Sequence, residues 1–303
     1  MRVTAAAGLL IVVWACLTGW DAIVHGHPLY GALLGATLLG SAFALWRTIG
    51  LGLPRKGGRR VTQTILLLAS LCWIALLVWL RPFSAVEPAL SAMSSDTRIS
   101  VADDPTQIVL TPISSTSHTG VFFQPGARVD PRAYAAILRP LAEAGHEVVI
   151  AKQPLGIAFL SSTTFDSTRH DHPSVTRWVV GGHSLGGTVA AMQADAGDAD
   201  PSAPVVGLLL FASYPADDIS TSLRATVLSI SGSRDGLATR DKIAASKATL
   251  PAGSSFVSID GAVHSFFGDY GAQPGDGTPT ISQDEARTRI SRASVDFVNN
   301  VSR

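Results

Sequence analysis

Three stretches without a charged residue lie within the first 80 residues of this 303-residue chain. They cover residues 5–20, 28–46 and 62–80, and each approaches the roughly 20 residues that cross a bilayer as a helix. Because a segment inside a bilayer must satisfy its backbone hydrogen bonds internally, such stretches become helices. We therefore predict a membrane anchor over residues 1–81, with three transmembrane helices at about 5–23, 28–46 and 62–80.

The basic residues of the two connections predict the orientation of this anchor. The first connection, residues 21–27, contains no Lys or Arg, whereas the second contains Arg47, Arg55, Lys56, Arg59 and Arg60. Basic connections stay on the cytoplasmic side, so the second connection is predicted to be cytoplasmic. The chain after about residue 82 is then expected outside the cytoplasm, as part of a multi-pass protein of the cell membrane.

Two other interpretations of the first stretch fit less well. Arg2 before a short apolar run is also typical of a cleaved signal peptide, and Cys16 could end a lipoprotein signal. However, no small-x-small cleavage site follows, Trp14 is a poor residue just before a lipidated cysteine, and two more apolar stretches come after. Cys16 and Cys72 both lie in the apolar stretches, so we expect no disulfide or thiol chemistry in the rest of the chain.

The remainder of the chain reads as a linker followed by one α/β domain. Residues 82–106 are rich in Ser, Ala, Pro and Asp and are interpreted as the linker, and residues 107–303 as the domain. Strand-like runs are at 107–112, 119–124, 147–153, 176–181, 205–213, 226–232 and 255–260, and helix-like runs at 130–145, 155–162, 184–197 and 282–301. This alternation predicts a mostly parallel sheet flanked by helices on both faces.

The sequence GHSLGG at residues 182–187 is the strongest motif. It has the GxSxG spacing through Gly182, Ser184 and Gly186, and it lies between an apolar strand-like run and a helix-like run. A serine in a strand-turn-helix of this kind sits on a tight turn, and the glycines let strand and helix approach closely. We predict that Ser184 is a nucleophile and that Gly182 and Gly186 form its elbow.

A serine nucleophile needs a histidine base and a carboxylate that orients it. Of the eight histidines, only His264 lies beyond the elbow, in a loop after the strand-like run 255–260. Asp235 follows the run 226–232 directly and is the preferred acid, with Asp217 or its neighbour Asp218 as the reserve. The order serine, aspartate, histidine is the one found in α/β-hydrolases.

The oxyanion of a tetrahedral intermediate needs backbone N–H donors. One is expected from Leu185, at the start of the helix after the serine. The other is expected from the turn after residues 119–124, at Ala127 or alternatively at Gly126, because Pro125 has no N–H.

Other chemistry has weaker support. The formal net charge of zero gives no basic footprint for nucleic acid. His170 and His172 could ligate a metal, but no third ligand is evident, and histidines in polar loops are more often solvated. We therefore predict no metal site and no cofactor.

Taken together, the segments around Ser184, Asp235 and His264 resemble the α/β-hydrolase family, and within it small, lid-poor bacterial serine hydrolases related to dienelactone-hydrolase-like esterases. The resemblance covers nearly all of residues 107–303, with one departure at Ala262 and Val263, where many relatives have a glycine and a polar residue. It implies a Ser-Asp-His triad at Ser184, Asp235 and His264 and an oxyanion loop at Gly126 and Ala127. Our first hypothesis is a serine hydrolase that cleaves carboxylic esters, and a domain exposed on a membrane suggests small-molecule or lipid-like esters as substrates. An acyltransferase that uses the same acyl-enzyme, and a non-catalytic envelope binding protein, are the alternatives.

Overall fold

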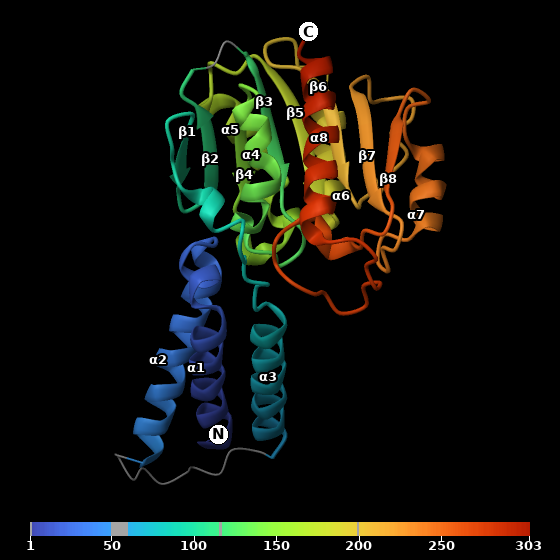
Figure 1. Cartoon of the computed structure of the whole chain (residues 1–303). Helices are drawn as coiled ribbons and strands as arrows, with labels where there is room; N and C mark the ends of the chain where they lie inside the picture. The colour runs from blue at the N-terminus through green and yellow to red at the C-terminus, as the bar shows by residue number, and fades with distance from the viewer. Residues whose placement is uncertain (1, 50–59, 115–116, 199) are drawn as a thin grey trace.

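Figure 1 shows the computed structural model, in which three long helices stand on one side of an α/β domain. The structure describes residues 2–49, 60–114, 117–198 and 200–303. Arg55, Lys56 and Arg59, on which the predicted orientation partly depends, lie outside the described residues.

The three N-terminal helices agree with the predicted spans to within one helical turn. They are α1 (Arg2–Val24), α2 (Pro28–Ile49) and α3 (Arg60–Trp79), and each is long and apolar enough to cross a membrane. Polar bonds join them in the described structure: Trp73 Nε1 donates to Thr37 Oγ1 at 3.0 Å, and Tyr30 Oη donates to the backbone oxygen of Leu77 at 2.9 Å. Most large apolar side chains of α3 are exposed, which suits a lipid environment better than water.

The segment predicted as a linker contains the first strand of the sheet. β1 (Ile99–Asp103) pairs antiparallel with β2 (Gln107–Pro112) and forms the edge of the sheet. Within β1 only Ile99 is buried and Val101 is partly buried, so the alternation of apolar and polar residues that marks a half-buried strand is limited to Ile99, Ser100 and Val101. The linker of residues 82–106 is therefore shorter than predicted.

Among the described residues the sheet has eight strands in the order β1-β2-β4-β3-β5-β6-β7-β8. The strands after β2 are β3 (Thr119–Gln124), β4 (Glu147–Ala151), β5 (Arg177–His183), β6 (Val205–Phe211), β7 (Thr226–Gly232) and β8 (Ser255–Ile259). These six all run parallel to one another. Their apolar side chains are almost entirely buried, as expected for strands covered on both faces.

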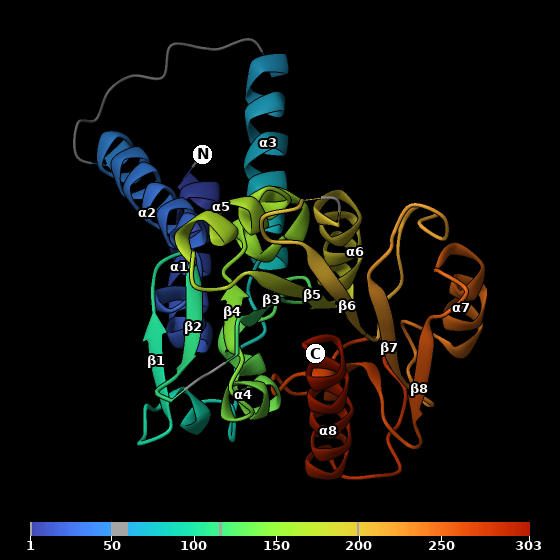
Figure 2. The same cartoon turned by 90° about the horizontal axis from the view of Figure 1, so that it is seen from above.

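Helices cover both faces of this sheet (Figure 2). On one face lie α4 (Ala135–Glu143) and α8 (Gln283–Val301), and on the other α5 (Thr164–Asp171) and α6 (Leu185–Gly197). A short α7 (Arg240–Ala245) lies beyond β7. The predicted helix at 155–162 forms only two short turns, η3 (Pro154–Gly156) and η4 (Ala158–Ser161). The predicted α/β class is confirmed.

Candidate active site

Ser184 lies on a strained turn between β5 and α6. Its φ is 52°, a left-handed conformation that a residue with a Cβ adopts only when the surroundings enforce it. A Cβ on Gly182 would lie 2.5 Å from the carbonyl carbon of Gly186, and one on Gly186 would lie 2.1 Å from the oxygen of Pro125. Both glycines are therefore required by backbone contact. A strained turn between a strand and a helix, closely packed through two glycines, is the geometry that a nucleophile elbow requires.

The structure brings Asp235 and His264 together. The Nδ1–H of His264 donates to Asp235 Oδ2 at 2.8 Å, and the other carboxylate oxygen accepts the N–H groups of Leu237 and Ala238, each at 2.7 Å. Both side chains are buried. With its proton on Nδ1, the imidazole of His264 has an unprotonated Nε2 that is able to accept a proton.

Ser184 and His264 lie in the same region but are not hydrogen-bonded to each other in the described structure. His264 Nε2 is buried and has no partner among the described residues. The ring of His183, next to Ser184 in the chain, has its centroid 4.6 Å from that of His264. Catalytic bonds of this kind are often long before substrate binds.

The turn after β3 carries the two N–H groups considered as the second oxyanion donor. The N–H of Gly126 donates to Tyr134 Oη at 2.8 Å, so it is already hydrogen-bonded, and Ala127 stays the expected oxyanion donor of this turn. The N–H groups of Ala127 and Leu185 have no hydrogen-bond acceptor among the described residues. The packing of Gly186 against Pro125 holds this turn next to the N-terminus of α6.

A model of the α/β-hydrolase family matches residues 120–288, which include Ser184, Asp235 and His264. The match covers more than half of the chain. The chain belongs to the α/β-hydrolase family. No curated protein sequence matches it.

Solved structures with a similar fold are distant from this hydrolase in sequence. A monoacylglycerol lipase from Paleococcus ferrophilus is 13% identical, with a TM-score of 0.49, and the alignment covers 68% of this chain and 100% of that one. A thermostable esterase from Pseudomonas putida is 15% identical, with a TM-score of 0.47 and coverages of 70% and 87%. Est1E from Butyrivibrio proteoclasticus is 12% identical, with a TM-score of 0.48 and coverages of 67% and 100%. At such identities the likeness says nothing about substrate.

His183, directly before the serine of the hydrolase, is fully buried. Its Nδ1 is 2.8 Å from Tyr134 Oη, the same hydroxyl that accepts the N–H of Gly126. Burial, and then the neighbouring His264, hold the pKa of His183 well below its usual range, so it stays neutral. Tyr134 and His183 together fix the turn after β3 against the turn of Ser184, and sequence reasoning missed the part of Tyr134.

A second missed residue is Asp276, in the loop between His264 and α8. Its carboxylate accepts N–H groups from four residues at 2.7 to 3.2 Å: Gly236, His264, Ser265 and Gly277. Although burial raises the pKa of Asp276, these four bonds outweigh it and lower the pKa below 3.8. Asp276 thereby ties the turn that carries Asp235 to the loop that carries His264. The one weak signal for Asp276 in the sequence is its position between two glycines.

Replacing Asp276 with asparagine should slow ester hydrolysis by about tenfold, because a misplacement of catalytic groups by a fraction of an ångström costs rate. It should also destabilise the chain by about 1–2 kcal/mol at neutral pH, since bonds to a partly exposed carboxylate are replaced by weaker ones. Rates on p-nitrophenyl butyrate and denaturant unfolding of the full chain measure both effects.

The pH dependence distinguishes this role of Asp276 from a packing effect. The folded pKa lies below the ordinary 3.8, so the stabilisation is present above about pH 3.8 and is lost as the pH falls through the folded value. The stability difference between native and Asp276→Asn chains should therefore shrink in acid. A stability difference between the two chains that stays constant down to acid pH would contradict a role of the ionised carboxylate. Asp217→Asn, at an exposed aspartate, is the control and should change neither quantity.

The reserve acids and the histidines considered as metal ligands are not hydrogen-bonded to Asp235 or His264 in the described structure. Asp217 and Asp218 are exposed, and Asp218 accepts the N–H of Ser220 instead. His172 Nδ1 contacts Glu147 at 2.6 Å, whereas His170 contacts its neighbour Asp171. No group of three possible metal ligands is found among the described residues.

Proposed function

We propose that this α/β-hydrolase is a serine hydrolase that cleaves carboxylic esters through an acyl-enzyme on Ser184. The observation that carries the proposal is the buried His264, which donates its Nδ1 proton to Asp235, keeps Nε2 unpaired, and has its ring 4.6 Å from that of His183, the residue before the strained Ser184. His183 Nε2 is also buried without a partner, so what distinguishes His264 is the carboxylate of Asp235 at its Nδ1, which fixes the tautomer that a general base needs.

The proposed reaction uses groups of the chain alone. Ser184 Oγ attacks the ester carbonyl while His264 Nε2 takes its proton, and Asp235 stabilises the resulting imidazolium. The N–H groups of Leu185 and Ala127 bind the oxyanion. When the intermediate collapses, His264 returns the proton to the leaving alcohol. A water then attacks the acyl-enzyme with His264 as base, which releases the carboxylic acid and regenerates Ser184.

The test is turnover of a short soluble ester by the full chain in detergent. We expect saturable release of p-nitrophenol from p-nitrophenyl butyrate together with an equal amount of free butyrate. Butyryl esters formed from an added alcohol, with little free acid, would instead indicate an acyltransferase. No turnover by a chain that still unfolds cooperatively would refute the proposal.

We also propose that α1, α2 and α3 anchor the enzyme in the cell membrane with the hydrolase domain outside the cytoplasm. The length and apolarity of the helices support an anchor, and the basic second connection supports the orientation. Alkaline phosphatase fused after Arg303 should be active, and a fluorescent protein at the same place should stay dark. Both reporters placed in the second connection should give the reverse pattern. If the two sites exchange these results, the orientation is inverted.

A further inference from the structure

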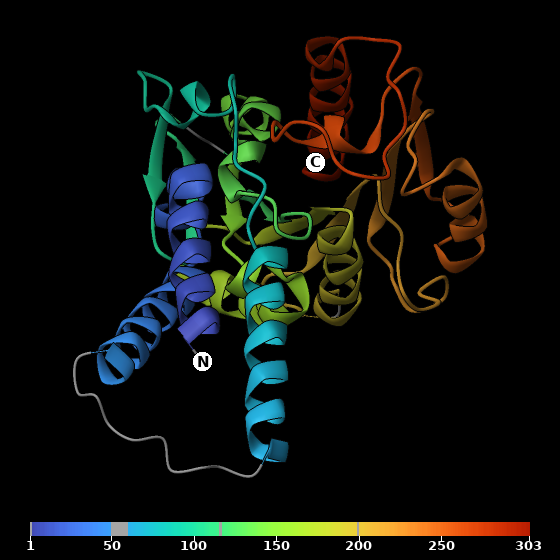
Figure 3. The same ribbon diagram turned by 90° about the horizontal axis from the view of Figure 1, so that it is seen from below.

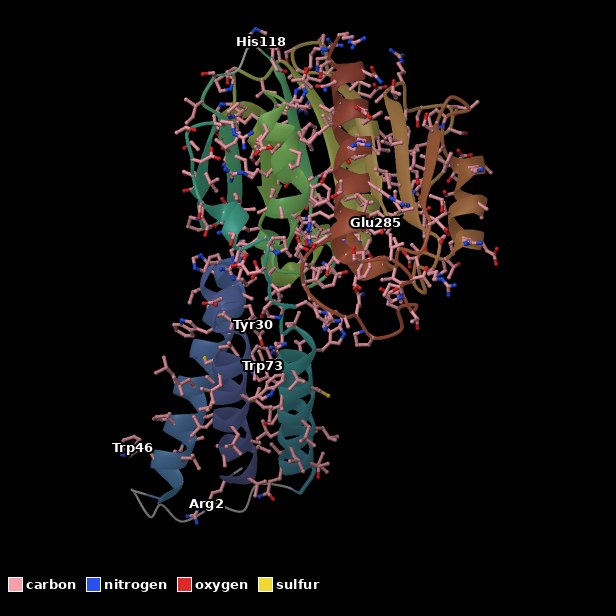
Figure 4. The ribbon with its side chains drawn as sticks, viewed as in Figure 1. Arg2, Tyr30, Trp46, Trp73, His118 and Glu285 are labelled. Atoms are coloured by element: carbon pink, nitrogen blue, oxygen red, sulfur yellow. The ribbon has the colours of Figure 1, made fainter. Side chains whose placement is uncertain are left out.

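The carboxyl ends of the central strands point toward the three N-terminal helices. His118, one residue before β3, lies at the far end of the molecule from Arg2 and Trp46 (Figure 4). β3 therefore runs toward the helices, and β4 to β8 run parallel to it. Because the catalytic groups follow the ends of these strands, they lie at the edge of the sheet nearest the helices.

Side chains at this edge contact the helices directly. Arg128, in the turn after β3, donates to the backbone oxygen of Trp79 at the end of α3, and its guanidinium lies 4.7 Å from the centre of the Trp79 ring. Lys152, after β4, pairs with Asp103 at 2.6 Å, and Asp103 is 2.7 Å from His25 in the connection of α1 and α2. The catalytic edge is thus fixed next to the ends of the helices.

Two large apolar side chains are exposed beside this edge, in the short turn η4. Phe159 is 46% and Leu160 56% exposed, and both follow the end of β4. Leu155, in the turn η3 just before them, packs against the apolar cluster between the helices, which includes Tyr30 and Leu80. The exposed pair therefore lies only a few residues from the junction of domain and helices.

A buried polar network holds η4 against the catalytic loops. Ser161 Oγ donates to Gln124 Oε1 at 3.2 Å, and Gln193 of α6 donates to the backbone oxygen of Ser162 at 2.9 Å. Gln153 bonds both Gln124 and the oxygen of Pro125, each at 2.9 Å. Since η4 is tied to the end of β3 and to α6, Phe159 and Leu160 are presented in a fixed position and are not the tip of a free loop.

Seen from below, the loop 268–282 that follows His264 lies beside α1, α2 and α3 and is not covered by them (Figure 3). The membrane that surrounds the helices would therefore face this loop and η4. Large apolar side chains at a bilayer surface are stabilised by insertion between headgroups and acyl chains.

We propose that Phe159 and Leu160 form a rim that inserts into the bilayer surface, so that the active site takes esters directly from the membrane. The substrate class is an amphiphilic ester whose long acyl chain stays in the bilayer until its carbonyl reaches Ser184. This inference rests on the proposed function. The bilayer is the favoured occupant because the rim is continuous with the ends of the helices through Leu155.

The test compares two esters with the same leaving group, using the full chain in phosphatidylcholine vesicles. One is soluble p-nitrophenyl butyrate, and the other is p-nitrophenyl palmitate dissolved in the vesicles. The double variant Phe159→Ser, Leu160→Ser should lose about tenfold in rate on the palmitate, which corresponds to about 1.4 kcal/mol. Its rate on the butyrate should stay within about twofold, because the rim contacts the bilayer and not the reacting groups.

Ile113→Ser is the matched control. Ile113 is 58% exposed but follows β2, which runs antiparallel to β4 and so ends at the opposite edge. Both rates should be unchanged in this variant. If the double variant loses no more than Ile113→Ser on the palmitate, or loses both activities equally, the bilayer rim is refuted while ester hydrolysis stands. If the native chain cleaves neither ester, the proposed function itself has failed.

Discussion

Replacing Ser184 with alanine is expected to lower kcat/KM on p-nitrophenyl butyrate by about 10⁴-fold or more. Without Oγ no acyl-enzyme can form, and only the oxyanion donors and substrate binding remain. The same variant should no longer react with a fluorophosphonate, which labels only an activated serine. Folding should be little affected, because the strained φ of 52° at Ser184 is accepted by alanine about as well as by serine.

The control for this prediction is Ser202→Ala, at an exposed serine in the loop before β6. It should keep both full turnover and full labelling. Labelling of the Ser184→Ala chain at the native level would place the reactive serine elsewhere and remove the basis of the proposed function. A second variant, His264→Ala, should abolish labelling although Ser184 is present, since activation requires the base.

The spans and the elbow could be predicted because their signals are local. A run of some twenty residues without charge has few alternatives to a membrane helix. Gly182 and Gly186 flank Ser184 between a strand and a helix, and each feature of that segment indicates the same turn. The pairing of Asp235 with His264 could be anticipated because parallel strands bring their carboxyl ends to one edge of the sheet.

The features that sequence reasoning missed depend on contacts between distant segments. The use of the Gly126 N–H by Tyr134 depends on how η2 (Pro131–Tyr134) folds back on the turn. The carboxylate of Asp276 accepts N–H groups from two loops that are distant in sequence, and no local sequence pattern predicts such contacts. β1 was not predicted because, at the edge of the sheet, only one of its residues, Ile99, is buried. The sequence does not show which end of the sheet faces the N-terminal helices. This became visible only in the structure, which contains both the helices and the α/β domain.

Replacing Asp235 with asparagine is expected to lower kcat/KM by about 10³ to 10⁴-fold while the fold is kept. The amide oxygen would still accept the N–H groups of Leu237 and Ala238, which now hold Oδ1 at 2.7 Å. The NH₂ group would then face His264 Nδ1, where the carboxylate now accepts at 2.8 Å. An NH₂ group donates, so Nδ1 must lose its proton and Nε2 must carry it. His264 could then no longer take the proton of Ser184.

The matched control is Asp217→Asn, the other aspartate considered from the sequence, which is exposed and bonded to neither His264 nor its loop in the described structure. It should retain the native rate, and thermal unfolding of both variants should stay close to that of the native chain. A large loss in Asp217→Asn with a native rate in Asp235→Asn would reverse the assignment of the acid. A loss in Asp235→Asn that tracks a fall in unfolding temperature would mean that Asp235 acts on folding, because a tautomer error lowers the rate without unfolding the site.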